Sequence, residues 1–300
     1  MANNNDQLYV DPALLRHAEQ ACRRRLESDP DNRAAIRSLA EVYRKLGDLG
    51  HAAAAYQRLV RLDPQDPEAG YLESVCSGTE WPGAPPGIRA APFVLLKDFL
   101  PAELHDSLIP FLVSRQDSFV PARILDAKGE RHYKPSYRDS LGFQGEWQGM
   151  KRFSRSFTDI LPGLFGRLHV APFAIDKIEL DLRAYRDGHF FKMHVDGRPS
   201  VPATANRIVS LVYYFHRQPR PYTGGELILF DSDPDSGQTT KARFTQVVPE
   251  DNTLLVFPSR FYHCVVPIQC PGPDFGDSRF VINGFVHQRV GAIEETGPRL

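Results

Sequence analysis

The chain has 300 residues, enough for two domains of ordinary size, and 42% of them are hydrophobic, enough to form buried cores. Its net charge is -1 and its Lys and Arg residues are spread along the sequence, which excludes the basic patch typical of nucleic-acid or anionic-membrane binding. It has no leader-like N-terminus and no long apolar run, and its 4 cysteines match neither a zinc knuckle nor a disulfide framework. We therefore expect a cytoplasmic protein with reduced thiols and with no nucleic-acid or membrane partner.

The first part of the chain carries a repeat. Pro30 and Pro64 lie 34 residues apart, and an aspartate precedes each of them. This period resembles that of tetratricopeptide repeats, in which each unit is a pair of helices. The apolar residues between the two prolines fall on two helix faces: Leu39, Ala40 and Tyr43, then Ala52, Tyr56 and Leu59. We count one full repeat with partial neighbours, although a plain helical bundle would carry similar faces.

A stretch rich in Gly and Pro at 77–91 marks a domain boundary. We expect residues 1–88 to form a small all-α module that ends in this linker, and residues 89–300 to form a second domain. Stacked repeats present a concave surface to peptides. A module this short could also serve only to buttress the second domain, so both roles stay open.

The second domain begins with elements of mixed type. Residues 92–115 read as a strand followed by a helix that has Pro101 at its first position. The polar segment 116–143 has little periodicity and is long for a connection, so it is a candidate substrate loop, with a surface excursion as the alternative. A second helix is expected over 147–168.

After Pro172 the sequence changes to short runs rich in Val, Ile, Tyr and Phe, separated by turn residues. Such runs without helix-length intervals predict antiparallel strands in a sandwich or closed barrel, and a jelly roll fits best. We therefore expect an α+β fold in which a small helical domain precedes a jelly roll with its core at about 172–290. The seven runs are 176–186, 189–196, 207–215, 225–231, 253–257, 261–267 and 279–287.

Candidate metal ligands lie within these runs. His194 and Asp196 are two residues apart, and alternate side chains of a strand point to the same face. His263 in a later run is a third candidate. Two histidines and one carboxylate on one side of an iron form the facial triad of non-haem Fe(II) oxygenases. Taken singly these residues are weak evidence, because such a tripeptide arises readily by chance and a strand histidine is usually structural.

The order of the motifs is more specific than any one of them. Over residues 92–287 it resembles the prolyl-hydroxylase-like branch of the Fe(II)/2-oxoglutarate dioxygenases, whose fold is a double-stranded β-helix. An early SYRDS segment at 136–140 matches that family's pre-barrel loop. The other elements are Tyr185 and Gly188 before His194-x-Asp196, the tandem Tyr213 and Tyr214, a Gly-Gly-Glu turn at 224–226, His263 and Arg279.

The resemblance implies a role for each matching residue. His194, Asp196 and His263 would be the catalytic iron ligands. Arg279 would form a salt bridge with the distal carboxylate of 2-oxoglutarate, Tyr214 would donate a hydrogen bond to the same carboxylate, and Tyr185 would line the cavity. Candidate substrate contacts are Arg207, Tyr137 and Arg138. The chain departs from the family pattern in an insertion at 269–278 and in Phe285, where several relatives carry Trp.

The reaction implied is hydroxylation of an unactivated C–H bond, with succinate and CO2 as co-products, Fe(II) as metal, 2-oxoglutarate as co-substrate and ascorbate as a supporting reductant. Because Asp196 is present, hydroxylation is favoured over halogenation. The branch favours a peptidyl, prolyl-type substrate. The alternatives are a small metabolite or carrier-tethered amino acid and, from another class, a catalytically silent peptide-binding adaptor. No feature of the sequence indicates the oligomeric state.

Overall fold

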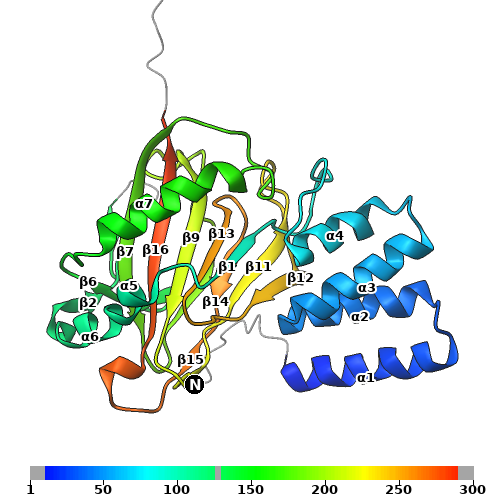
Figure 1. The fold of residues 1–300 in the computed structure, drawn as a ribbon, viewed down its shortest axis with the longest axis horizontal. Helices are drawn as coiled ribbons and strands as arrows, with labels where there is room; N and C mark the ends of the chain where they lie inside the picture. The colour runs from blue at the N-terminus through cyan, green and yellow to red at the C-terminus, as the bar shows by residue number, and fades with distance from the viewer. Residues whose placement is uncertain (1–10, 126–129, 290–300) are drawn as a thin grey trace, which may run out of the picture.

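The computed structural model describes residues 11–125 and 130–289 (Figure 1). Four antiparallel helices come first: α1 (Pro12–Ser28), α2 (Arg33–Leu46), α3 (Leu49–Leu62) and α4 (Pro67–Ser77). The side chains of Asp11, Asn32, Asp48 and Asp66 cap their N-termini by accepting backbone hydrogen bonds. Gly47, with φ of 75°, ends α2 in the left-handed conformation that favours glycine. The Asp-Pro and Gly signals of the repeat therefore correspond to helix boundaries.

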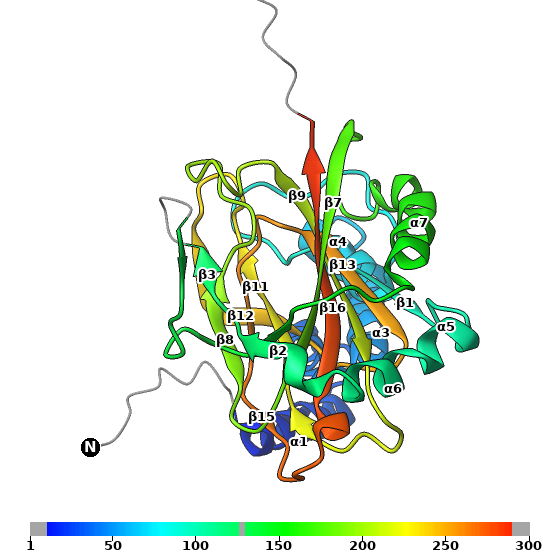
Figure 2. The ribbon, with the colours of Figure 1, turned by 90° about the vertical axis from the view of Figure 1, so that its left-hand side faces the viewer.

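Two antiparallel sheets follow and face each other (Figure 2). The larger has the order β1-β13-β9-β16-β7-β6-β2 and the smaller the order β12-β11-β14-β8-β5. This is a jelly-roll arrangement preceded by helices, as the sequence predicts. The strands of the larger sheet are β1 (Val94–Lys97), β13 (Thr253–Pro258), β9 (Arg207–Phe215), β16 (Arg279–Gln288), β7 (Ile175–Tyr185), β6 (Leu141–Phe143) and β2 (Phe119–Pro121). Those of the smaller sheet are β12 (Thr239–Val247), β11 (Leu227–Ser232), β14 (His263–Val265), β8 (Phe190–His194) and β5 (Arg138–Asp139). Two small pairs complete the set, β3 (Ile124–Leu125) with β4 (Arg131–His132) and β10 (Thr223–Gly224) with β15 (Ile268–Gln269).

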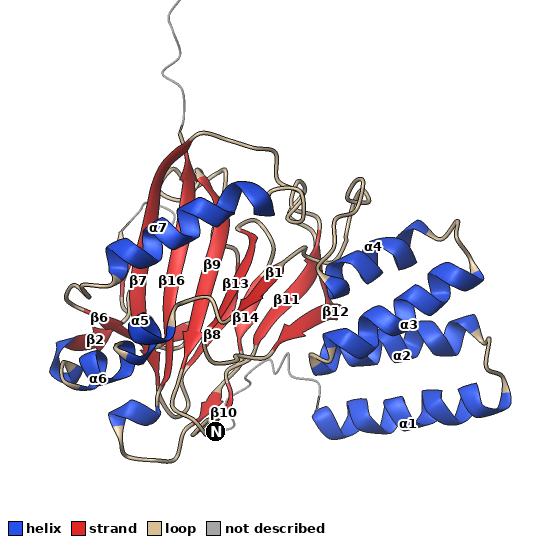
Figure 3. Ribbon diagram, viewed as in Figure 1, coloured by secondary structure: helices blue, strands red, loops and turns tan. Residues whose placement is uncertain are grey.

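Short helices cover the outer face of the larger sheet (Figures 2 and 3). They are α5 (Ala102–Asp106), α6 (Leu108–Val113) and α7 (Met150–Ile160). Phe153 and Phe157 of α7 are fully buried in one apolar cluster with Leu182 and Ala184 of β7. Because strand side chains alternate, the neighbouring residues Arg183 and Tyr185 face the interior between the sheets. The outer face of β7 is therefore apolar, and its inner face carries the polar groups.

The helical module packs directly against the smaller sheet. In Figure 1, α2 lies beside β12. Tyr56 of α3 and Val247 of β12 belong to one buried apolar cluster, which continues into the interior of the jelly roll. Arg243 of β12 forms an ion pair of 3.0 Å with Glu68 of α4. The module and the jelly roll therefore share a continuous core.

Several expected elements differ from the structure. The segment 116–143 contains the 3-10 turn Gln116–Ser118 and five short strands, β2 to β6, rather than a loop without regular structure, and its residues 126–129 lie outside the described residues. The helix expected within 92–115 is two short helices separated at Ser107, and the helix expected over 147–168 changes to a 3-10 turn at Leu161, next to Pro162.

The two-residue strands β10 and β15 lie outside the predicted runs, and one long strand was also missed. The nine-residue strand β12 reads TTKARFTQV, whose Lys241 and Arg243 conceal the apolar alternation. The seven predicted runs each contain a strand, but β8 ends at His194, so Asp196 lies just beyond the strand rather than within it. No helix within 11–125 or 130–289 combines the length and apolar character needed to cross a membrane.

Candidate metal centre

The structure brings His194, Asp196 and His263 together in one cluster, in which the two histidines are buried and Asp196 is half-buried. One ligand atom from each residue lies within 4.8 Å of the others. Nε2 of His194 is 3.4 Å from Oδ1 of Asp196, and Nε2 of His263 is 3.3 Å from Oδ2 of the same carboxylate. The two histidines are paired across β8 and β14, which sets their rings side by side with centroids 4.2 Å apart. Three donors of this kind gathered around one point suit a divalent metal.

Backbone groups fix the direction of both imidazoles. Nδ1 of His194 donates to the carbonyl of Lys192 at 2.8 Å, and Nδ1 of His263 donates to the carbonyl of Phe261 at 3.0 Å. Because a carbonyl can only accept, the proton of each neutral ring lies on Nδ1. Both Nε2 atoms therefore lie on the ring edge that faces Asp196, where each can bind a metal once it carries no proton.

The carboxylate of Asp196 is oriented by two serines that sequence reasoning missed. Ser210 Oγ donates to Oδ2 of Asp196 at 2.8 Å and is also 2.8 Å from Ser259 Oγ. The carbonyl of Ser259 accepts hydrogen bonds from the backbone N–H groups of Asp196 and Gly197. A signal for Ser210 exists in the sequence, because it is the one small polar residue inside the apolar core of RIVSLVYYF.

The electrostatics of the cluster favour a cation. Burial, together with the charge of His263, lowers the pKa of His194 to about 4, so its ring is neutral at pH 7. Burial opposes ionisation of Asp196, but the two histidines outweigh it and hold the pKa of the carboxyl well below its usual range. Burial would lower the pKa of His263, but the charge of Asp196 outweighs it and raises that pKa. A carboxylate flanked by two imidazoles therefore fits a metal, which would displace the proton of His263.

Arg279, the first residue of β16, is 1% exposed, and its Nε and Nη2 have no hydrogen-bond partner. Its guanidinium carbon lies 4.9 Å from the ring centroid of Tyr185 and 5.1 Å from that of Tyr214. The buried hydroxyl of Tyr214 also lacks a hydrogen-bond partner. Buried donors of this kind are costly when unpaired, so the group fits the carboxylate of a ligand.

A glycine makes room for this arginine. Gly225 has φ of 72°, and a Cβ atom added to it would lie 2.6 Å from Cδ of Arg279. The predicted Gly-Gly-Glu turn therefore has a steric reason.

The insertion at 269–278 leaves Arg279 in place. Arg186 donates to the carbonyls of Gly272 and Pro273 at 3.0 and 3.1 Å, and Asp187 accepts the backbone N–H of Cys270 at 2.9 Å. These contacts tie the insertion to the end of β7, and Arg279 still pairs with Tyr185.

Tyr185 lies on the inner face at 1% exposure, beside Arg279. Burial would raise its pKa, but the charges of Arg138, Arg279 and Arg183 outweigh burial and lower the pKa of the phenol. This part of the interior therefore carries an excess of positive charge.

Tyr137 and Arg138 lie near the metal cluster through Phe191. The ring of Phe191 stacks on His194 with centroids 3.6 Å apart. Tyr137 meets Phe191 edge-on at 5.8 Å, and the guanidinium of Arg138 lies 4.5 Å above the same ring. Both candidate substrate residues are thus one ring away from a candidate metal ligand.

Arg207 is engaged elsewhere. Its Nη2 forms an ion pair of 2.9 Å with Glu179, which also accepts from His287 at 3.2 Å. Its guanidinium lies 3.9 Å above Phe285. Within 11–125 and 130–289, no contact joins Arg207 to the metal cluster. Phe285, at the position where several relatives of the resembled family carry Trp, serves here as the platform for this arginine.

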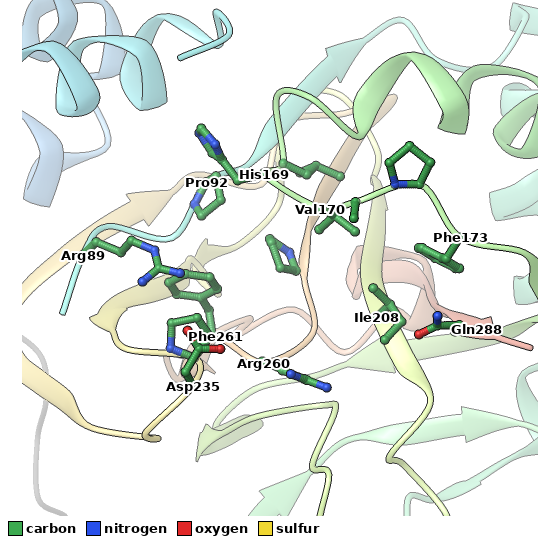
Figure 4. Close-up of a pocket in the computed structure, with 15 residues that line it drawn as sticks. Arg89, Pro92, His169, Val170, Phe173, Ile208, Asp235, Arg260, Phe261 and Gln288 are labelled. Atoms are coloured by element: carbon green, nitrogen blue, oxygen red, sulfur yellow. The ribbon is translucent and has the colours of Figure 1, made fainter. Parts of the chain in front are cut away.

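A separate groove of about 310 Å³ lies between the linker and the jelly roll (Figure 4). Arg89 and Phe261 form one side, and Ile208 and Gln288 lie on the other. Its lining includes none of the candidate catalytic, cofactor or substrate residues.

Two family models match separate parts of the chain. Residues 180–287 match the 2OG-Fe(II) oxygenase superfamily, and residues 33–72 match a tetratricopeptide repeat. An uncharacterised PKHD-type hydroxylase of Synechocystis sp. is 29% identical over 197 residues, or 65% of this chain. The matched part is 63% of that relative, so the chain spans less than two thirds of its length.

Two solved structures are also similar. A Pseudomonas putida prolyl-4-hydroxylase has 21% identity and a TM-score of 0.48, covering 67% of this chain and 94% of that one. A Trichoplax adhaerens prolyl hydroxylase, solved with a hypoxia inducible factor peptide, has 18% identity and a TM-score of 0.49, covering 66% of this chain and 84% of that one.

Proposed function

Because the chain contains a 2OG-Fe(II) oxygenase domain at residues 180–287 and a tetratricopeptide repeat at residues 33–72, we propose that it is a 2-oxoglutarate-dependent dioxygenase that hydroxylates a peptidyl, prolyl-type substrate. One observation carries the proposal: the buried, unpartnered guanidinium of Arg279 shares an interior wall with the metal cluster. Ser210 and Tyr214 both belong to β9, where Ser210 contacts Asp196 and Tyr214 lies beside Arg279 of β16. Ser210 and Tyr214 are four residues apart, which is about 13 Å along a strand. A five-carbon dicarboxylate can bridge this distance if the metal cluster binds one of its ends and the side chain of Arg279 binds the other.

Each residue then has a defined task. His194, Asp196 and His263 would hold the metal and leave the opposite side open. Arg279 would bind the distal carboxylate of 2-oxoglutarate, Tyr214 would donate to it, and Tyr185 would wall the cavity. Iron and 2-oxoglutarate, when bound, supply the oxidising power that hydroxylates a C–H bond, with succinate and CO2 as co-products. The burial of His194 and His263, with Asp196 half-buried, limits the access of water to the metal-facing side.

The substrate assignment rests on chemistry near the metal and on the repeat. Tyr137 and Arg138, one ring away from His194, are positioned to contact a substrate, whereas Arg207 is already paired. A tetratricopeptide repeat favours a peptide or protein over a small metabolite. We assign residues 1–88 to the helical module and 89–300 to the oxygenase domain; residues 1–10, 126–129 and 290–300 lie outside the described residues.

The test is direct. Under anaerobic conditions, Fe(II) and 2-oxoglutarate together should give a charge-transfer absorption band. In air, with ascorbate as supporting reductant, peptide substrates should gain the mass of one oxygen atom while succinate accumulates. The Asp196→Ala variant should fold, but it should give no charge-transfer band and should not hydroxylate the peptides. A protein that shows no band and consumes no 2-oxoglutarate would overturn the proposal, and a band without turnover on any peptide or amino acid would favour the silent adaptor.

A further inference from the structure

A second buried guanidinium, besides that of Arg279, lacks a carboxylate partner on the interior wall. Arg138 of β5 is 8% exposed, and its Nε donates to Ser140 Oγ at 3.2 Å. Among the residues that the structure describes, it forms no ion pair with a carboxylate. It lies over Phe191, which stacks on His194. The cation therefore lies beside the metal cluster and not at the protein surface.

The other charges of this wall are accounted for. Arg183 contacts the carboxylate of Asp181 two residues away on the same face of β7, and Arg207 is paired with Glu179. Asp139, next to Arg138 in sequence, lies 3.6 Å from His189. If Arg279 binds 2-oxoglutarate, as the proposed function requires, Arg138 is the one guanidinium left over among the described wall residues.

The surroundings of Arg138 add positive charge instead of removing it. Burial, and then the charge of Arg138, lower the pKa of Arg183 to about 10. The same charge contributes to the lowered pKa of Tyr185. Like charges held together out of water are unfavourable, and an anion that bound between them would relieve the repulsion. Among the described residues, the carboxylates whose charge acts on Arg183 are Asp181 and Glu179, and Glu179 is already paired with Arg207.

We infer that Arg138 binds a carboxylate of the substrate and so selects substrates that carry an anion near the carbon to be hydroxylated. This inference rests on the proposed function. The carboxylate could belong to an acidic residue next to the target in a peptide or to the free carboxyl group of an amino acid. Planar guanidinium and carboxylate groups form paired, charge-assisted hydrogen bonds, whereas an amide of the same shape forms weaker ones.

Matched carboxylate and amide ligands test the inference. The protein is loaded with Fe(II) and 2-oxoglutarate without oxygen, and binding is measured by isothermal titration calorimetry. One set of ligands is proline peptides with blocked ends that carry Glu or Gln on either side of the proline. The other pair is free L-proline and L-prolinamide. We expect the carboxylate member of at least one pair to bind tenfold or more tightly, and the pair that responds identifies the source of the carboxylate.

Variants assign the preference to one residue. Arg138→Gln should bring each carboxylate ligand to the affinity of its amide, while Arg138→Lys should keep part of the preference. Arg198→Gln is the matched control, because it removes the same charge from an exposed side chain whose field also reaches Tyr137. It should keep the full preference.

Two results would overturn the inference: equal affinities within every pair for the wild-type protein, or a preference that survives in Arg138→Gln. Each variant is first checked for the charge-transfer band with 2-oxoglutarate, which Arg138→Gln should retain. If the wild-type protein showed no charge-transfer band, this result would count against the proposed function itself. A normal band with equal carboxylate and amide binding would remove only the role of Arg138.

Discussion

Arg44 of α2 and Asp231 of β11 form an ion pair of 2.6 Å, with side-chain exposures of 0% and 3%. Arg44 also donates to the carbonyl of Phe244 on β12 at 3.2 Å. Burial would lower the pKa of Arg44, but the charges of Asp231 and Glu41 outweigh it and raise that pKa well above its ordinary value. The helical module is thus tied to the jelly roll by a charge that neither partner could bury alone. This supports a buttressing role for the module, whatever else it binds.

Breaking this pair should be costly. Arg44→Met leaves the carboxylate of Asp231 buried without its main partner, so we expect the free energy of unfolding to fall by about 3–5 kcal/mol. Urea denaturation at neutral pH measures the change. The double variant Arg44→Met with Asp231→Leu should recover most of the loss, because both buried charges are gone. As a control, Arg37→Met removes a partly exposed ion pair with Asp66 and should cost no more than about 1 kcal/mol. Equal costs for the two single variants would contradict this account.

Ser210 should matter for the metal although it is not a ligand. Ser210→Ala removes the hydrogen bond to Oδ2 of Asp196, so the carboxylate is less firmly oriented. Loss of such a supporting group typically weakens metal binding or activity by about 10–100-fold. Calorimetric titration with Fe(II) or Mn(II) without oxygen measures this effect. Ser232→Ala, which also removes a buried serine but from β11, is the control and should leave metal affinity unchanged.

Arg279→Gln should separate co-substrate binding from metal binding. Truncating one partner of a buried charge pair costs about 2–5 kcal/mol, so we expect the KM for 2-oxoglutarate to rise about thirtyfold or more. Metal affinity should stay within about twofold, a range that corresponds to only ~0.4 kcal/mol. Arg155→Gln makes the same change of charge on an exposed position of α7 and should alter neither value. An unchanged KM in Arg279→Gln would show that the distal carboxylate binds elsewhere.

Asp251 should contribute to acid sensitivity. Burial opposes its ionisation, but hydrogen bonds from His105 and from the backbone N–H of His216 outweigh it and lower the pKa of the carboxyl. A group with a lowered folded-state pKa stabilises the protein above its ordinary pKa, and this stabilisation is lost as the pH falls below about 4.

The matching variant is Asp251→Asn, which keeps the shape of the side chain but cannot titrate. Its melting temperature should lie below that of the wild type at pH 7, and the difference should shrink as the pH is lowered toward 3. Melting curves across that range provide the measurement. A difference that stays constant with pH would show that the carboxylate charge of Asp251 does not contribute.

The strand pattern and the order of motifs were readable from the sequence because each depends on local chemistry. The run 207–215 coincides with β9, and the Gly-Gly-Glu turn corresponds to a position where a side chain would meet Arg279. What stayed hidden depends on partners distant in sequence. Arg44 lies in the sequence as an ordinary helix arginine, and only the fold brings Asp231, 187 residues away, against it.

Dependence on partners distant in sequence also explains why parts of the candidate site could not be predicted. In the sequence the four arginines of the site cannot be told apart, because it does not show which carboxylate each one meets. They are Arg138, Arg183, Arg207 and Arg279. Only the fold reveals that Asp181 and Glu179 pair with two of them, and that the other two meet no carboxylate among the described residues. Ser210 was missed because a hydroxyl in an apolar strand has meaning only once Asp196 is found opposite it.

Strand β12 forms the outer edge of the smaller sheet, and α2 lies along it. An open strand edge is a template for pairing with another chain, and natural proteins often cover such edges with a helix. In this protein the cover is a repeat that in other settings is a portable unit. Recombination that carried the oxygenase half to a new gene would therefore uncover an edge prone to self-association, so we expect the two halves to be inherited together.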